Sequence, residues 1–205
     1  MLKGTRQSTG YRNDIKLYAN KIDQYPIVHE MTHTLLGYGE NFGSTRGFFT
    51  QEGYAVYMES EYGESTLMNY GFSTHEIVKL LMNKDKNLPL NKLITQGFDT
   101  SYFRPVMNDP GDNALQWMSY MHAGSFVTYL IEKYGREDFE KVYNQANLPK
   151  KLNEVYGKSE QELEKEWLTY IENTSEITAE EKEMVDNLDN LNAIINSIDE
   201  DLFQR

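Results

Sequence analysis

Hydrophobic positions along this chain recur mainly at helical spacing. Phe126, Leu130 and Tyr134 follow one another at intervals of four residues. That interval places side chains on one face of an α-helix, where they can pack together. The pattern predicts a long amphipathic helix over about 113–134, which Gly135 ends.

Two further helices are predicted by their first turns. Ser73 with Glu76, and Ser159 with Glu162, have the spacing of a capping box. In that motif the serine hydroxyl and the glutamate carboxylate each accept a backbone N–H at the start of a helix. Thr50 is a candidate cap for another helix. Other helices are expected over about 26–36, 50–59, 137–145, 151–156 and within 176–205.

Strands are expected only near the N-terminus. Residues 1–22 are rich in Gly, Thr, Arg and Asn, with one candidate strand over about 14–19. Residues 37–49 are predicted to be a glycine-rich loop, and 83–112, with three prolines, to be mostly irregular. The fold class is therefore predicted to be mainly α, of the α+β type, and 175–205 to be an acidic helical tail.

Composition excludes several classes of protein. The 205-residue chain has a formal net charge of -12, which argues against binding nucleic acid or anionic lipid. It has no cysteine, so disulfides and thiolate metal sites are excluded. No run approaches the ~20 apolar residues of a membrane span. Residues 1–20 do not resemble a signal peptide, so a cytoplasmic location is expected, or secretion if a leader has been removed. The oligomeric state stays open.

The sequence His29-Glu30-Met31-Thr32-His33 is the main candidate for chemistry. Histidines at positions i and i+4 lie one helical turn apart on the same face, so both rings can bind one metal ion. Glu30 would then accept a proton from a water molecule at the metal. The plain alternative is that both histidines are half-buried helix residues and Glu30 is solvated.

A catalytic zinc site needs a third protein ligand and an open position for water. Without cysteine, a carboxylate on a neighbouring helix is the natural ligand. Glu52 follows His33 after eighteen intervening residues, enough for one helix to end and a second to pack beside it. Gly53 next to it would permit a close approach of the helices. Glu40 and Glu59 are rival carboxylates, and Glu40 lies too near the end of the first helix. Glu59 could instead orient His29 or His33.

These residues resemble a known family. The pattern His-Glu-x-x-His, eighteen residues and then Glu-Gly-x-Ala-x-Tyr is similar to that of the gluzincin metallopeptidases, with the interval of the M1 aminopeptidase branch. The segments 120–135 and 155–168 resemble the helices that follow in bacterial peptidase-MA-like domains. The resemblance covers about residues 24–172, and the metal motif is its most specific part.

The resemblance implies a thermolysin-like zincin domain over 1–174, with a reduced N-terminal sheet, of which 1–22 would be the remnant, and a C-terminal helical subdomain. It implies one zinc ion held by His29, His33 and Glu52, with Glu30 as general base. It also implies a donor to the oxyanion of the tetrahedral intermediate, for which Tyr120 and His122 are the candidates. The candidate strand at 14–19 would offer its edge to extended substrate.

The function expected from these residues is zinc-dependent hydrolysis of peptide bonds in a peptide or protein substrate. No Gly-x-Met-Glu-Asn segment is present, so cleavage from the amino terminus is not indicated. The alternative is an inactive, truncated peptidase-like domain that binds metal or peptide. A third possibility is a helical interaction protein with an accidental motif. Cobalt or manganese would also suit two histidines and a glutamate.

Overall fold

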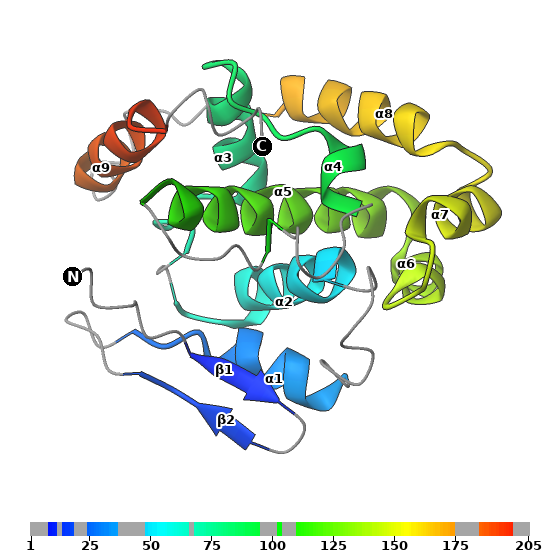
Figure 1. Cartoon of the computed structure of the whole chain (residues 1–205), viewed down its shortest axis with the longest axis horizontal. Helices are drawn as coiled ribbons and strands as arrows, with labels where there is room; N and C mark the ends of the chain where they lie inside the picture. Colours follow the sequence, from blue (N-terminus) through cyan, green and yellow to red (C-terminus); the bar gives the residue numbers. More distant parts are fainter. Residues whose placement is uncertain are drawn as a thin grey trace.

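Helices make up most of the described chain, and a two-stranded hairpin near the N-terminus is the only sheet within it (Figure 1). The computed structural model describes residues 8–11, 14–18, 24–36, 48–65, 68–94, 102–103, 110–174 and 185–198. Strand β1 (Thr9–Tyr11) pairs antiparallel with β2 (Asp14–Lys16). The prediction of a mainly α chain is confirmed. The expected strand at 14–19 is shorter, because β2 ends at Lys16.

The hairpin lies against helix α1 (Ile27–Leu35), which carries the two histidines of the motif. Gly10 of β1 makes this contact possible. A Cβ atom at that position would overlap the backbone carbonyl oxygen of Glu30 on α1. The strand therefore covers the helix at the residue between the two histidines, and only glycine allows so close an approach.

Helix α2 (Phe48–Tyr62) lies between α1 and the long helix α5 (Pro110–Tyr134), as Figure 1 shows. Small residues let α2 and α5 approach closely. A Cβ at Gly53 would lie 2.7 Å from the carbonyl oxygen of Ala123 and 2.7 Å from Val127 Cγ2. Gly53, which adjoins Glu52, thus serves the contact with α5, on the far side of α2 from the hairpin.

The remaining helices cover the other side and the end of α5 (Figure 1). Trp167 of α8 is fully buried, and its ring lies 5.5 Å from that of Phe126 on α5. None of the helices among the described residues has the length and apolar character needed to cross a membrane. The helices are α3 (Thr74–Met82), α4 (Leu90–Ile94), α6 (Arg136–Val142), α7 (Leu148–Tyr156), α8 (Glu160–Glu172) and α9 (Val185–Asn196).

Both predicted capping boxes are confirmed, at Ser73 before α3 and Ser159 before α8. The expectation for Thr50 is wrong. Helix α2 begins two residues earlier, at Phe48, and the Thr50 hydroxyl accepts the backbone N–H of Asn144 instead. The stretch predicted to be irregular contains α4. Of the glycine-rich loop predicted over 37–49, residues 37–47 lie outside the described residues, and the prediction is wrong for Phe48 and Phe49, which form the start of α2.

The acidic tail contributes a helix, α9, to the hydrophobic core. Leu191, Ile195 and Ile198 are buried in the same cluster as the core residues of α3 and α5. Lys86 donates from Nζ to the carbonyl oxygens of Ile195 and Ile198, at 3.0 and 2.6 Å. A cation at the carboxyl end of a helix opposes the negative end of its dipole, so this contact stabilises the docked α9.

Candidate metal centre

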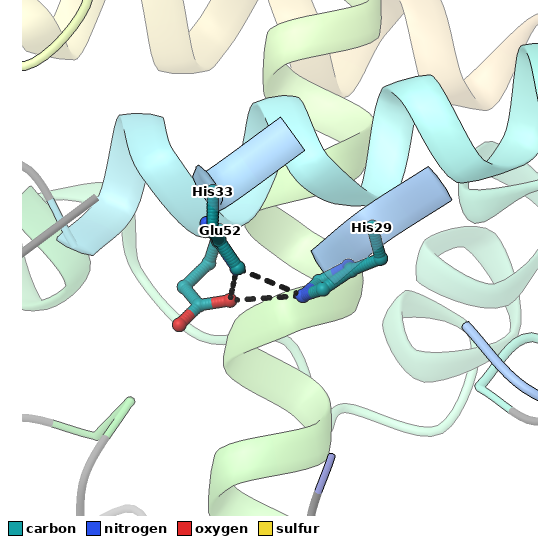
Figure 2. Close-up of side chains that lie close together, drawn as sticks. All are labelled: His29, His33 and Glu52. Atoms are coloured by element: carbon teal, nitrogen blue, oxygen red, sulfur yellow. Dashed lines mark hydrogen bonds and ion pairs between the residues drawn. The ribbon is translucent and has the colours of Figure 1, made fainter. Parts of the chain in front are cut away.

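His29 and His33 project from one face of α1 toward α2, and Glu52 reaches them from the second turn of α2 (Figure 2). The opposite face of α1 carries exposed apolar side chains, among them Met31 and Leu35. The three candidate ligands are only 4%, 3% and 1% exposed. Helix α1 therefore buries its polar motif residues and exposes apolar ones, the reverse of an ordinary amphipathic helix. Such an inversion calls for a specific partner for the buried polar groups.

The atoms of these side chains that face one another form a nearly equilateral triangle. His33 Nε2 lies 3.1 Å from His29 Nε2 and 3.2 Å from Glu52 Oε2. His29 Nε2 lies 3.3 Å from the same carboxylate oxygen. Figure 2 shows these three contacts meeting between the helices. Among the described residues, this is the group of potential metal ligands that lies close enough to share one ion.

The triangle has the right size for a zinc ion. The point equidistant from its corners lies about 1.85 Å from each atom, which is the circumradius of these three sides. Typical bond lengths are about 2.0–2.1 Å from zinc to histidine nitrogen and about 2.0–2.2 Å to carboxylate oxygen. An ion slightly outside the plane of the three atoms would meet those lengths without movement of any side chain. The residues present therefore fit the metal.

The chemistry of the donor atoms supports the same conclusion. Two ring nitrogens and a carboxylate oxygen point at one another, so their lone pairs converge on a buried point unless protons separate them. Burial lowers the pKa of the His29 imidazole, but its hydrogen bond to Glu52 and the negative charges of Glu52, Glu30 and Glu59 outweigh this effect and raise it. The electrostatic environment that favours an imidazolium also favours a divalent cation.

Glu30 lies on α1 between the two histidines and is 5% exposed. The Thr34 hydroxyl donates to its backbone carbonyl at 3.0 Å, within the helix. The charge of Glu30 contributes to the raised pKa of His29, so the carboxylate and the ring lie in the same poorly screened region. The role of Glu30 as the base stays a prediction.

Tyr120 and His122, the two candidate oxyanion donors, face different parts of the protein. The Tyr120 ring stacks beside that of His29, with centroids 6.2 Å apart. His122 is fully buried on another side of α5, where its Nδ1 bonds the Met118 carbonyl at 2.7 Å and its Nε2 accepts the Leu88 N–H at 3.0 Å. Both of its nitrogens are occupied. Of the two, only Tyr120 lies beside a candidate ligand.

Glu59, a rival ligand in the sequence, contacts the site in another way. Its Oε2 accepts the backbone N–H of His29 at 2.8 Å, and its Oε1 accepts that of Ser65 at 3.1 Å. The carboxylate binds the main chain of the first ligand rather than its ring. The sequence suggested Glu59 as a residue that could orient His29 or His33, and it lies seven residues after Glu52, two turns along the same face. Glu40, the other rival, lies outside the described residues.

Comparison with known proteins identified no relative of this chain. No family model matches the chain, and no match was found among curated proteins or solved structures. What can be said of function therefore depends on the geometry of the site itself and on the chemistry of its side chains.

Proposed function

We propose that this protein is a zinc-dependent peptidase in which His29, His33 and Glu52 hold the metal. The convergence of their three buried ligand atoms on one point, with sides of 3.1–3.3 Å, carries the proposal. Three protein ligands leave a fourth position open, as a catalytic zinc site requires. A structural zinc site would use four protein ligands, and no fourth potential ligand joins the three among the residues described.

When bound, zinc would polarise the carbonyl of a peptide bond and lower the pKa of a coordinated water toward about 7. Glu30 would accept the proton of the attacking water as its oxygen bonds to the carbonyl carbon. Glu30 would then deliver that proton to the leaving nitrogen as the C–N bond breaks. Tyr120 is the candidate donor to the oxygen that becomes negative, because its ring lies beside His29.

In the fold that we propose, α1 and α2 are the two metal-bearing helices of a thermolysin-like gluzincin domain. Its support is the order of elements: a hairpin packed on the first helix, the second helix beside it, and a long third helix, α5, behind both. The tyrosine of the third helix then faces the first ligand. In this proposal the two-stranded sheet would be the reduced N-terminal sheet expected from the sequence.

The alternative is a domain that binds metal or peptide without cleaving it. The observation in its favour is the length of the hairpin, because β1 and β2 have only three residues each. An edge strand this short offers few backbone groups to an extended substrate.

Glu30→Gln separates these functions. The glutamine preserves shape and cannot act as a base, so kcat for cleavage of labelled casein should fall about 10²–10⁴-fold. Zinc content should stay as in the wild type. Glu64→Gln, an exposed glutamate beyond the end of α2, is the matched control and should retain full activity. A Glu30→Gln protein with full zinc-dependent activity would exclude Glu30 as the base, and a wild type that binds zinc but cleaves nothing would favour the alternative.

A further inference from the structure

The corner between α6 and α7 is fixed to α2 directly beside Glu52. The backbone N–H of Asn144 donates to Thr50 Oγ1 at 2.9 Å, and Gln51 Nε2 donates to Asn144 Oδ1 at 2.6 Å. Asn144 holds a left-handed backbone conformation, with φ of 56°, which asparagine tolerates better than most residues. Two of the residues just before the metal ligand thus hold this corner in place, and with it the neighbouring residue Tyr143.

The Tyr143 side chain is held in position, yet its hydroxyl lacks a partner. Its ring packs against Tyr54 of α2, with centroids 5.8 Å apart, and against Phe139 of α6, at 6.2 Å. Its hydroxyl oxygen is buried and has no hydrogen bond to any residue that the structure describes. Leaving such a group unpaired costs about 1–3 kcal/mol. A fixed, unpaired hydroxyl of this kind calls for an explanation, such as a bound ligand.

The electrostatic surroundings of the Tyr143 hydroxyl include the candidate ligand Glu52. Burial raises the pKa of Tyr143, and the negative charge of Glu52 raises it further. The group is therefore protonated at neutral pH, and it can donate a hydrogen bond. Because a phenol in this state is uncharged, it suits a neutral acceptor such as a peptide carbonyl oxygen.

We propose that Tyr143 is a substrate-binding residue of this site, whose hydroxyl donates to a backbone carbonyl oxygen of the bound peptide next to Glu52. This inference rests on the proposed peptidase function. It assigns Tyr143 to the binding of substrate, apart from Tyr120, which lies beside His29 and is the candidate for stabilising the oxyanion. The α6–α7 corner would then form one side of the substrate site.

The test compares Tyr143→Phe with Tyr156→Phe. Tyr156 is a matched control, because its hydroxyl is also buried without a partner among the described residues, while its ring packs on Tyr134, at 4.8 Å. Neither variant loses a hydrogen bond to a residue that the structure describes, so both should unfold at or above the denaturant midpoint of the wild type in metal-free buffer. The zinc Kd of both should stay within about twofold of the wild-type value.

The functional measurements are kcat and KM for casein and the Kd of a leucyl-alanine hydroxamate for the zinc-loaded protein. Tyr143→Phe should raise KM and the hydroxamate Kd about tenfold, the loss expected for one hydrogen bond. Because this contact is present before and during the reaction, kcat should change less than about twofold. Tyr156→Phe should match the wild type in every measurement.

The outcomes separate this inference from the proposed function. Equal KM and hydroxamate Kd in the two variants would overturn the role of Tyr143 while leaving the peptidase intact. A tenfold weaker zinc Kd in Tyr143→Phe would also overturn it, because the hydroxyl would then serve Glu52 rather than substrate. If the wild type binds zinc and the hydroxamate but cleaves nothing, the peptidase proposal fails, and the hydroxamate Kd alone decides on Tyr143. A wild type that binds neither overturns both.

Discussion

The Glu59 carboxylate accepts the backbone N–H of His29 at 2.8 Å and so joins the far end of α2 to the start of α1. Helix α1 needs such a partner, because Pro26 at its N-cap provides no side-chain hydrogen bond. A Cβ at Gly63 would overlap the Glu59 carboxylate, so the glycine leaves it room. One residue of α2, Glu52, thus meets the rings of α1, and another holds its backbone. The first ligand is fixed at both its side chain and its main chain.

Replacing Glu59 should weaken the metal site more than a surface change would. Glu59→Ala removes both the hydrogen bond to His29 and a negative charge near it, so the zinc Kd should rise about 10–100-fold, as for other groups that orient metal ligands. Glu59→Gln keeps an acceptor and should show a smaller effect. Competition with a chelator measures the Kd. Glu61→Ala, an exposed glutamate on the same helix, is the control for charge alone. Equal values for Glu59→Ala and Glu61→Ala would contradict the positioning role.

Gly53→Ala should disturb the metal site through the contact between α2 and α5. The added methyl group would lie 2.7 Å from the carbonyl oxygen of Ala123, so α2 must move away from α5 and carry Glu52 with it. We expect a loss of about 1–3 kcal/mol in the free energy of unfolding and a weaker zinc Kd. Urea denaturation measures the first. Ser60→Ala, exposed on the same helix, should change stability by less than about 0.5 kcal/mol. A fully stable Gly53→Ala protein would show that the helices are farther apart than described.

Stability should depend on pH through His122. Burial lowers the pKa of this imidazole to about 4, against its usual value of 6.5, although its hydrogen bond to Met118 raises it slightly. The unfolded chain therefore binds the proton first, and stability falls as pH drops from about 6.5 to about 4. Between about pH 7 and pH 4.5 this one group should account for a loss of about 2 kcal/mol. His122→Gln replaces the imidazole with a side chain of similar size that does not titrate, so this variant should lack that loss of stability.

Urea denaturation of the metal-free protein at the two pH values checks this expectation. Chelation of zinc is needed because protonation of the ligand histidines would otherwise contribute through metal release. His122→Gln should be less stable than the wild type at neutral pH, since it disturbs the bond to Leu88, but its stability should change less with pH. The same dependence on pH in both proteins would mean that His122 titrates normally in the folded state.

The elements and residues predicted well from the sequence are those determined locally. The capping boxes at Ser73 and Ser159 are confirmed because the motif needs only residues three apart. His29 and His33 lie on one face for the same reason, the pitch of a helix. The same periodicity separates Tyr120 from His122, since neighbours two apart on a helix lie about 200° apart and cannot both face one site.

What the sequence could not show depends on contacts between distant segments. Thr50 resembles a helix cap, but its hydroxyl accepts an N–H from Asn144, 94 positions along the chain. Nothing local indicates that partner. The sequence suggested that Glu59 could orient His29, but it could not show that the carboxylate binds the main chain of His29 rather than its ring. Tyr143 could not be singled out among fifteen tyrosines until its packing on Tyr54 and its buried, unpaired hydroxyl were known.

The most direct test of the central claim is zinc content, measured by elemental analysis of the wild type and of His33→Ala purified side by side. The geometry predicts about one zinc ion per wild-type chain and almost none in His33→Ala, because two remaining ligands cannot hold the ion through purification. His75→Gln, which alters a histidine that bonds Ser125 on the other side of α5, should retain the metal. Wild-type protein without zinc after purification in its presence, or equal zinc in His33→Ala, would contradict the account.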